Sequence, residues 1–411
     1  MPKTIARLKS KSCSLFILAS IIFVGICAAN LKLISDLEKS QVGVVIIGSS
    51  GNDNNVVPKS PFSGNTDTII NINLASIQDN STDNSSNNNN NNDLVLEYFR
   101  EAVGVELDDE SIERLPTWSQ IESLIGDKPV LLGLERCNDF RNDVPPLRRM
   151  LGSSGMFNSG TNLVTRLMKE NCVIPERYEK YGPRGTKAEY GIRRQCPWGK
   201  HTPVNEKYNH TAPKNENINK DDCLPVVTIR NPYDWMQSMC RHPYTAKWSM
   251  HERRVRGNIC PHLVYTDSKK DKLLPVELKA KLAEQWMEFG SLAHLWNEWY
   301  AQYWRDANFP YLIVRFEDLI FRQYDTTKII CDCAGGAVNS KSAFKYIVDS
   351  AKQGPGHGKK EERTGMIDAW IKYGKPKEVK AGFSDLDWEA SLEFLSRELM
   401  GKMGYRYPPS E

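Results

Sequence analysis

The sequence predicts an α/β protein with a central parallel sheet, and three stretches carry this prediction. In residues 150–168 and 226–238, an apolar segment typical of a buried strand runs directly into a helical segment. In the third stretch, an amphipathic helix precedes a short apolar strand at 311–316. A helix that leads into a buried strand fits the right-handed crossover between parallel strands.

Two long helices are predicted in the second half of the chain, from apolar residues at helical spacing. The first runs through Leu282, Trp286, Phe289, Ala293, Trp296, Tyr300 and Tyr303. The second is predicted at 385–403, with a buried stripe of Trp388, Leu392, Leu395 and Leu399. Gly404 is suited to end it, because glycine readily takes the left-handed conformation of a C-terminal cap.

A glycine-rich turn joins the strand and the helix of the first stretch. Residues 155–162 read Gly-Met-Phe-Asn-Ser-Gly-Thr-Asn. Such a turn binds phosphate or sulfate, because the unpaired N–H groups and the helix dipole both favour an anion. Thr161 follows Gly160 where a nucleotide P-loop has lysine, which argues against ordinary NTP hydrolysis. The alternative is a turn that only caps a core helix.

The second stretch has the residues of a second anion site. Arg230 lies at the carboxyl end of the predicted strand, where open α/β sheets bind ligands. Pro232 suits the first position of the following helix, and Asp234 suits its first turn. Ser238 lies two turns into that helix. An arginine that binds phosphate and a serine that hydrogen-bonds it fit this spacing.

The two stretches resemble the two cofactor sites of the sulfotransferase family, which uses PAPS. In that family a Ser-Gly-Thr loop holds the 5′-phosphosulfate, and an Arg-Asn-Pro…Ser segment holds the 3′-phosphate. Residues 311–319, Tyr-Leu-Ile-Val-Arg-Phe-Glu-Asp-Leu, are similar to the family's later strand and its Arg-Tyr-Glu-Asp-Leu ending. The resemblance covers 148–407 and implies a three-layer sandwich with a P-loop-like phosphosulfate-binding loop.

The resemblance assigns cofactor binding to three groups of residues. They are Asn158, Ser159, Gly160, Thr161 and Asn162 in the loop; Arg230 and Ser238 at the 3′-phosphate; and Lys359, Lys360 and Arg363 in a late basic segment. In the family such a segment often closes over the 3′-phosphate, and a solvated run of charge is the alternative. Asn158 stands where the family usually has a lysine that contacts the sulfuryl bridge.

Lys200 and His201 are the predicted catalytic residues. They resemble a Lys-x-His-x-Pro segment that lies between the two cofactor motifs in the cytosolic branch and carries the catalytic base. A histidine is suited to take a proton from an acceptor hydroxyl near neutral pH. Lys200 would supply the positive charge missing at Asn158. A surface histidine in a polar loop is the alternative for His201, and His242 is the rival base.

The predicted reaction moves a sulfuryl group from PAPS to a hydroxyl or amine and leaves PAP, with no metal required. Two other functions stay open. One is a non-catalytic lumenal binding protein on the same fold, which the asparagine at 158 favours. The other is a P-loop kinase. The net charge of +3 is too small for a nucleic-acid binder.

The first quarter of the chain predicts a location in the secretory pathway. A basic cytoplasmic tail at 1–11 precedes an uncharged, mostly apolar run at 12–30, the predicted transmembrane signal anchor. The charge order puts the remainder in the lumen, as a single-pass type II Golgi membrane protein. Secretion after signal cleavage near Ala29 is the alternative.

The rest of the chain divides into a flexible Asn-rich stalk at 31–93, a lead-in segment of short helices at 94–145 and a sulfotransferase-like domain at 146–411. An anchored, lumenal enzyme is expected to act on a glycan or a secreted protein. Eight cysteines follow the anchor and predict at least two disulfides in an oxidising compartment. They are Cys137, Cys172, Cys196, Cys223, Cys240, Cys260, Cys331 and Cys333.

Overall fold

The structure is a computed structural model that describes residues 94–248, 260–267, 269, 272–352, 364–375, 379–380 and 382–406. The described residues all belong to one compact unit, 64–411. The predicted tail, anchor and stalk lie outside the described residues, as do Lys359, Lys360 and Arg363. Within the part of the chain that is described, no helix is long and apolar enough to cross a membrane.

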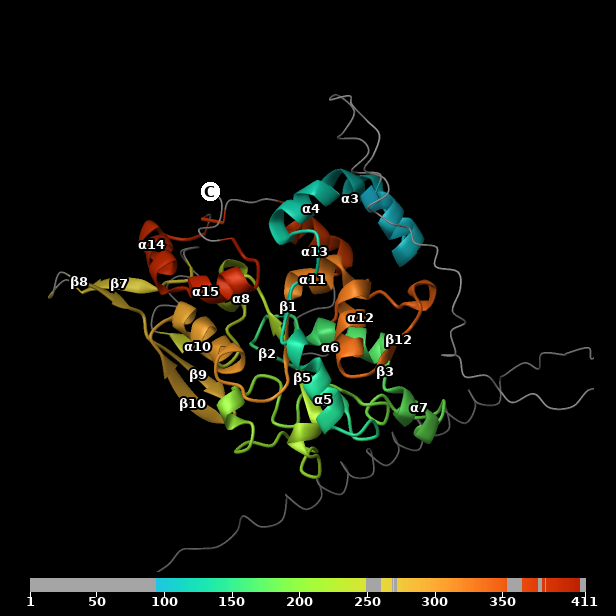
Figure 1. Ribbon diagram of the computed structural model, residues 1–411. Helices are drawn as coiled ribbons and strands as arrows, with labels where there is room; N and C mark the ends of the chain where they lie inside the picture. Colours follow the sequence, from blue (N-terminus) through green and yellow to red (C-terminus); the bar gives the residue numbers. More distant parts are fainter. Residues whose placement is uncertain are drawn as a thin grey trace, which may run out of the picture. The chain divides into compact units, whose positions relative to one another are not determined.

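The centre of the fold is a five-stranded sheet in the order β1-β11-β5-β2-β4 (Figure 1). Its strands are β1 (Leu131–Leu132), β2 (Met150–Gly155), β4 (Ile192–Arg193), β5 (Cys223–Ile229) and β11 (Leu312–Arg315). Four of them run parallel to their neighbours, with β2 and β11 on either side of β5. The edge strand β1 is antiparallel to β11, so the sheet is mixed where a parallel sheet was predicted.

Helices cover both faces of this sheet (Figure 1). Leu224 and Val226 of β5 face a core formed with α5 (Cys137–Asp143), α6 (Thr161–Asn171) and α12 (Gln323–Cys333). Val227 and Ile229 face the opposite core, formed with α8 (Pro232–Arg241), α10 (Leu292–Trp304), α14 (Asp385–Phe394) and α15 (Arg397–Lys402). This alternation is the period of two of a strand buried on both faces.

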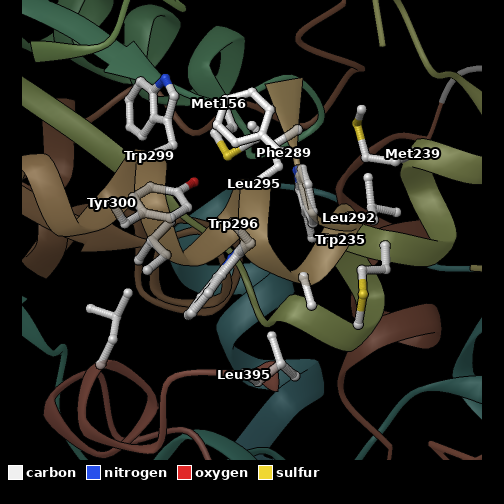
Figure 2. Close-up of a cluster of buried hydrophobic side chains, with 14 of the residues drawn as sticks. Met156, Trp235, Met239, Phe289, Leu292, Leu295, Trp296, Trp299, Tyr300 and Leu395 are labelled. Atoms are coloured by element: carbon white, nitrogen blue, oxygen red, sulfur yellow. The ribbon is translucent and has the colours of Figure 1, made fainter. Parts of the chain in front are cut away.

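The second core is rich in large aromatic rings that come mainly from α8 and α10. Figure 2 shows Trp235, Trp296, Trp299 and Tyr300 in one cluster, and all four side chains are buried. The rings of Trp296 and Trp299 lie 5.4 and 5.0 Å from that of Tyr300. Side chains of this size dominate the apolar area that a core removes from water. The position of α10 fixes the backbone around the candidate site, because the indole of Trp296 donates to the Arg230 carbonyl.

The lead-in segment packs on the same body of the protein. It contains a π-helix η2 (Tyr98–Val103), α3 (Asp109–Arg114) and α4 (Trp118–Ile125), which confirms the short helices predicted there. Thr117 and Gln120 form a capping box at the start of α4. Phe99 and Ile121 pack with residues of α11 (Phe316–Phe321) and α13 (Met366–Tyr373) in a third core.

The remaining elements surround these layers. They are η3 (Leu134–Arg136), β3 (Cys172–Val173), α7 (Pro175–Tyr181), η4 (Val204–Glu206), η5 (Lys220–Asp222), β6 (Lys247–Trp248), β7 (Val264–Asp267), β8 (Lys272–Pro275), β9 (Leu278–Leu282), β10 (Gln285–Phe289), β12 (Ala337–Val338) and η6 (Lys341–Ala343).

The helix predicted from Leu282 onward is wrong in its first half. Residues 278–289 form an antiparallel hairpin of β9 and β10, and α10 begins only at Leu292. In β9 the apolar residues at 278, 280 and 282 are buried and alternate with lysines, which is the period of a strand. Ala283 and Glu284 make the turn with positive φ values of 49° and 62°. Ser291 then starts α10 by accepting the N–H of His294.

The helix predicted at 385–403 is broken into α14 and α15. Ser396 caps α15 by accepting the N–H of Leu399. Asn297 holds the break from α10, because its side chain donates to the Phe394 carbonyl and accepts the Ser396 N–H. Trp388, Leu395 and Leu399 are buried and Leu392 is partly buried, so most of the predicted stripe faces the core. Gly404 has φ +65°, as expected of a helix stop.

The stretch at 311–319 contains a buried network of ion pairs and hydrogen bonds. The Arg315 guanidinium makes two hydrogen bonds to Asp318, at 2.7 and 2.9 Å, and both side chains are fully buried. Arg322 donates to the same carboxylate at 3.1 Å, and so does the Val130 N–H at 3.0 Å. Arg315 also donates to the Ile125 and Met403 carbonyls. This network joins β11 to α4 and α15. Arg315 and Asp318 therefore support the fold.

Three disulfides confirm the prediction of at least two. They join Cys137 to Cys333, Cys172 to Cys331 and Cys240 to Cys260. Cys331 and Cys333 thus bind different partners, and α12 is linked to both α5 and β3. Disulfides of this kind persist in oxidising environments, which indicates a secretory or extracellular compartment.

Candidate functional site

The loop between β2 and α6 has a backbone that only small or permissive residues adopt. Gly155 has φ +143°, and a Cβ there would lie 2.6 Å from the Thr228 hydroxyl. Gly160 has φ +99°, and a Cβ there would overlap the ring of Phe316. Asn158 has φ +60°, a left-handed conformation that asparagine tolerates better than most residues. The chain is therefore folded into a tight turn directly before α6.

The start of α6 offers unpaired N–H groups. Within the residues that the structure describes, the N–H groups of Gly160, Thr161 and Asn162 have no hydrogen-bond partner. They stand at the positive end of an 11-residue helix. Donors and dipole together make this turn suited to a phosphate or sulfate group.

The side chains of two predicted loop residues form hydrogen bonds to other parts of the protein. Ser159 is fully buried, and its hydroxyl donates to the Met156 carbonyl at 2.8 Å. The Asn158 amide donates to the carbonyls of His242, at 2.8 Å, and Ser238, at 3.3 Å. Asn158 therefore ties the loop to the C-terminal end of α8. These two side chains shape the loop and leave its backbone N–H groups as the donors available to a ligand.

Arg230 directly follows β5, and its side chain contacts this loop. One guanidinium nitrogen donates to the Asn158 carbonyl at 3.2 Å, and another donates to the Tyr373 hydroxyl at 3.0 Å. The rings of Phe316 and Tyr373 each lie 4.9 Å from the guanidinium carbon. The side chain is only 5% exposed. The geometry holds the guanidinium in one orientation between two rings and the loop.

The charge of Arg230 is only partly offset by protein groups: burial works to lower its pKa, but Tyr373, Asp234 and Glu317 raise it. Among the described residues neither of these carboxylates lies within ion-pair distance of it, and its Nε is buried without a hydrogen-bond partner. Burying an arginine in this state is costly unless a partner satisfies it. An anionic ligand is the kind of partner that would satisfy both the charge and the free N–H.

Other cations gather around Arg230. Burial lowers the pKa of Lys352, and the charges of Arg230, Arg241 and Lys372 lower it further. Burial also lowers the pKa of His242, with added effects of Lys352 and Arg241. These shifts show that several like charges lie close together. Such a concentration of positive charge is typical of a site for a doubly charged anion.

Ser238 lies beside these residues, and sequence reasoning missed three of them, Arg241, Lys352 and Tyr373. The Ser238 hydroxyl accepts from Arg241 at 3.1 Å. Arg241 follows Ser238 by three residues on α8, so helical spacing contained a signal for it. Lys352 and Tyr373 come from distant segments, and no local pattern links them to Arg230.

Lys200 lies at the other side of the loop, beside the start of α6. The Gly155 N–H donates to the Lys200 carbonyl at 2.9 Å, which fixes the backbone next to β2. The Lys200 ammonium donates to the Asn162 side chain at 2.7 Å. Burial lowers the pKa of Lys200 to about 8, helped by the charges of Arg194 and Lys169. A bound anion would stabilise the charged form of Lys200 and raise its pKa.

His201 has one ring nitrogen fixed by the same loop. Its Nδ1 lies 2.6 Å from the Gly155 carbonyl oxygen. Because a carbonyl only accepts, Nδ1 carries the hydrogen and the lone pair is on Nε2. Burial lowers the pKa of His201 to about 4, with a further lowering by Lys200. The imidazole is therefore neutral at physiological pH, and a bound anion would raise its basicity.

The structure thus brings most of the predicted residues to one loop. Lys200 and His201 touch it on the side of α6 and β2, and Arg230 and Ser238 touch it through Asn158. A separate cavity of about 590 Å³ shares none of these residues; it is lined by Pro145, Pro146, Leu147, Glu176, Glu179 and Lys180.

Comparisons of this chain with protein-family models, with curated proteins and with solved structures find no match.

Proposed function

We propose that this protein is a PAPS-dependent sulfotransferase with a three-layer α/β fold and a P-loop-like phosphosulfate-binding loop. The observation that carries the proposal is the state of Arg230. Its guanidinium is buried, no carboxylate among the described residues lies within ion-pair distance of it, and its Nε lacks a hydrogen bond. A protein retains such a group where a ligand completes it.

PAPS has anionic groups at two ends of one nucleotide, and the site has two places for them. The N–H groups at the start of α6 take the 5′-phosphosulfate, as at other helix N-termini. Arg230 and Ser238 take the 3′-phosphate, with Arg241 and Lys352 adding positive charge. A nucleotide without a 3′-phosphate would use only the first place. The predicted Lys359, Lys360 and Arg363 would add to the second.

The residues beside the sulfuryl position supply a base and a cation. His201 Nε2 accepts the proton of the acceptor hydroxyl or amine while the acceptor atom bonds to sulfur and the sulfur–oxygen bond to the nucleotide breaks. PAP leaves with the bridging oxygen. Lys200 offsets the negative charge that develops on this oxygen, in place of a lysine at 158. Catalysis then rests on positioning and charge stabilisation, as in phosphoryl transfer.

The disulfides and the apolar run at 12–30 support the cellular setting that we propose. The disulfides indicate an oxidising compartment. Within it we place the protein in the Golgi membrane, anchored by residues 12–30 with the 146–411 domain in the lumen. The acceptor is a glycan or a secreted protein. Secretion after signal cleavage is the alternative location.

A non-catalytic PAPS-binding protein is the second candidate, and one contact favours it. The side chain of Asn158 is used to hold α8, so the position of the family's lysine adds no charge to the cofactor. Such a protein would bind PAP through Arg230 and would transfer nothing.

Transfer of label tests the proposal. The full chain is incubated with PAPS labelled with ³⁵S and with a mixture of glycan and tyrosine-peptide acceptors. We expect labelled acceptor and an equal amount of PAP. PAP binding without label transfer would establish the non-catalytic candidate, and failure to bind PAP would reject both.

The pH dependence tests the assignment of Lys200. Its pKa of about 8 means that its charge is lost as the pH rises through 8. We expect kcat/KM for PAPS to fall above this pH by about tenfold per unit, because kcat/KM reports ionisation in the free enzyme. In Lys200→Arg the fall should move to higher pH, since arginine stays protonated.

The free energy of unfolding should rise over the pH range in which kcat/KM falls. A loss of activity in this range is therefore not caused by unfolding. The folded protein binds the Lys200 proton less tightly than the unfolded chain does, whose lysine has the ordinary value of 10.5. Folding therefore gains stability from this group as the pH rises from about 8 to 10.5. If kcat/KM instead stays flat to pH 10, measured by initial rates, Lys200 is not the cation at the sulfuryl group.

A further inference from the structure

The two described cysteines outside the three disulfides, Cys196 and Cys223, are neighbours. They form a small buried cluster with Trp198, and they are 0% and 3% exposed. The Cys196 thiol faces the Gly152 carbonyl at 3.4 Å. The Cys223 sulfur lies 2.8 Å from the point where a Cβ on Gly152 would be, and Cys196 Cα lies 3.0 Å from the same point. The bare glycine therefore leaves the space in which the two residues meet.

The backbones of both cysteines are held by the central sheet. Cys223 is the first residue of β5 and lies opposite Met150 of β2. The Cys196 N–H donates to the Ser153 carbonyl of β2 at 3.2 Å. Both residues are thus fixed against one strand, Cys223 at Met150 and Cys196 at Ser153, on either side of Gly152. A disulfide requires Cα atoms about 4.4–6.8 Å apart, so both cysteines have to be held close together, and their contacts with β2 and with Gly152 do this.

The surroundings make the thiols inert once the protein has folded. Burial raises the pKa of Cys196, and the hydrogen bond and charge of Cys223 raise it further. The thiolate is the reactive form, so a buried thiol with a raised pKa exchanges slowly. Trp198 is fully buried and packs in the same cluster as the pair. A bond between these sulfurs therefore has to form during folding, while they are still accessible.

We infer that Cys196 and Cys223 form a fourth disulfide when the chain folds in an oxidising compartment. One cysteine thiolate attacks the disulfide of an oxidant, either an oxidoreductase or glutathione disulfide, and forms a mixed disulfide while one oxidant thiol leaves. The second cysteine thiolate then attacks the sulfur of the first, and the remaining oxidant thiol leaves. The cysteines lose two electrons and two protons in total, and the oxidant disulfide is reduced to two thiols.

This bond has a structural consequence for the candidate site. Cys196 lies four residues before Lys200 and five before His201, in a segment without a long helix or strand. Cys223 begins β5, which ends directly before Arg230. The disulfide closes a loop of about 27 residues and anchors the segment with the predicted base to the strand that leads to the predicted phosphate-binding arginine. The inference does not depend on the proposed reaction.

Mapping of the disulfides tests the inference. The full chain is produced in the secretory pathway of a eukaryotic cell, blocked with a maleimide in acidic denaturant without reductant, digested and measured by mass spectrometry. We expect a linked pair of peptides that contain Cys196 and Cys223, lighter by two hydrogens than the separate peptides. Maleimide on both cysteines, with the other three disulfides intact, would overturn the inference, and so would either cysteine linked elsewhere.

The single variant Cys196→Ser is the control for partner identity. We expect maleimide on Cys223, while the peptides of the other three disulfides remain linked and report a folded chain. If Cys223 stays unlabelled in this variant, its partner is another residue and the assignment fails.

Discussion

His201→Ala is expected to lower turnover by about 10²–10⁴-fold, the usual contribution of a general base. Affinity for PAP should stay nearly unchanged, because the imidazole contacts the Gly155 carbonyl and, among the described hydrogen bonds, none joins it to Arg230 or Ser238. Initial rates at saturating PAPS give the turnover, and calorimetry gives the PAP affinity. A variant that lost both would point to a damaged loop instead of a missing base.

His210→Ala is the matched control for this variant. The Nδ1 of His210 also lies 2.7 Å from a backbone carbonyl oxygen, that of Trp198, and its side chain is also partly buried. It makes no contact with the loop at 155–162 among the described residues. We expect turnover near that of the unmodified protein. If His201→Ala also keeps near-normal turnover, the base is elsewhere, and His242 is the next candidate.

Arg230→Ala is expected to weaken PAPS and PAP binding by about 1.5–3 kcal/mol, the range for hydrogen bonds to a charged group. This corresponds to roughly a 10–150-fold rise in Kd. Turnover should also fall, because binding energy far from the breaking bond positions the reacting end. The affinity is measured by calorimetry and the turnover with labelled PAPS.

Arg230→Lys separates charge from geometry. It retains a positive charge near Lys352 but loses the planar fork that reaches the Asn158 carbonyl and the Tyr373 hydroxyl. We expect an affinity between those of the unmodified protein and Arg230→Ala. Unchanged PAP binding in Arg230→Ala would remove the observation on which the proposed function rests.

The sequence predicted the residues of the site better than their contacts. The glycines of the loop and the pair Arg230 and Ser238 have local signals, since turn geometry and helix position require particular residue types. The role of Asn158 was not visible, because it depends on carbonyl groups of α8 that come near only in the folded chain. The cation at Lys352 and the ring of Tyr373 have no local signal for the same reason.

The fold errors have equally specific causes. In the hairpin at 278–289, apolar residues satisfy the helical period and also the period of a strand, and packing against α10 selects the strand. The break at Ser396 depends on a side chain of α10, Asn297, which no pattern in residues 385–403 reveals. The antiparallel edge strand β1 has only two residues, too few for a periodic signal.

Titration calorimetry of the full chain with PAP and with ADP tests the central claim most directly. The two nucleotides both carry phosphate at the 5′ end, and only PAP has the 3′-phosphate assigned to Arg230 and Ser238. We predict that PAP binds roughly 10–150-fold more tightly, the difference expected for hydrogen bonds to a charged group. Equal affinities for PAP and ADP would contradict the assignment of this protein as a sulfotransferase.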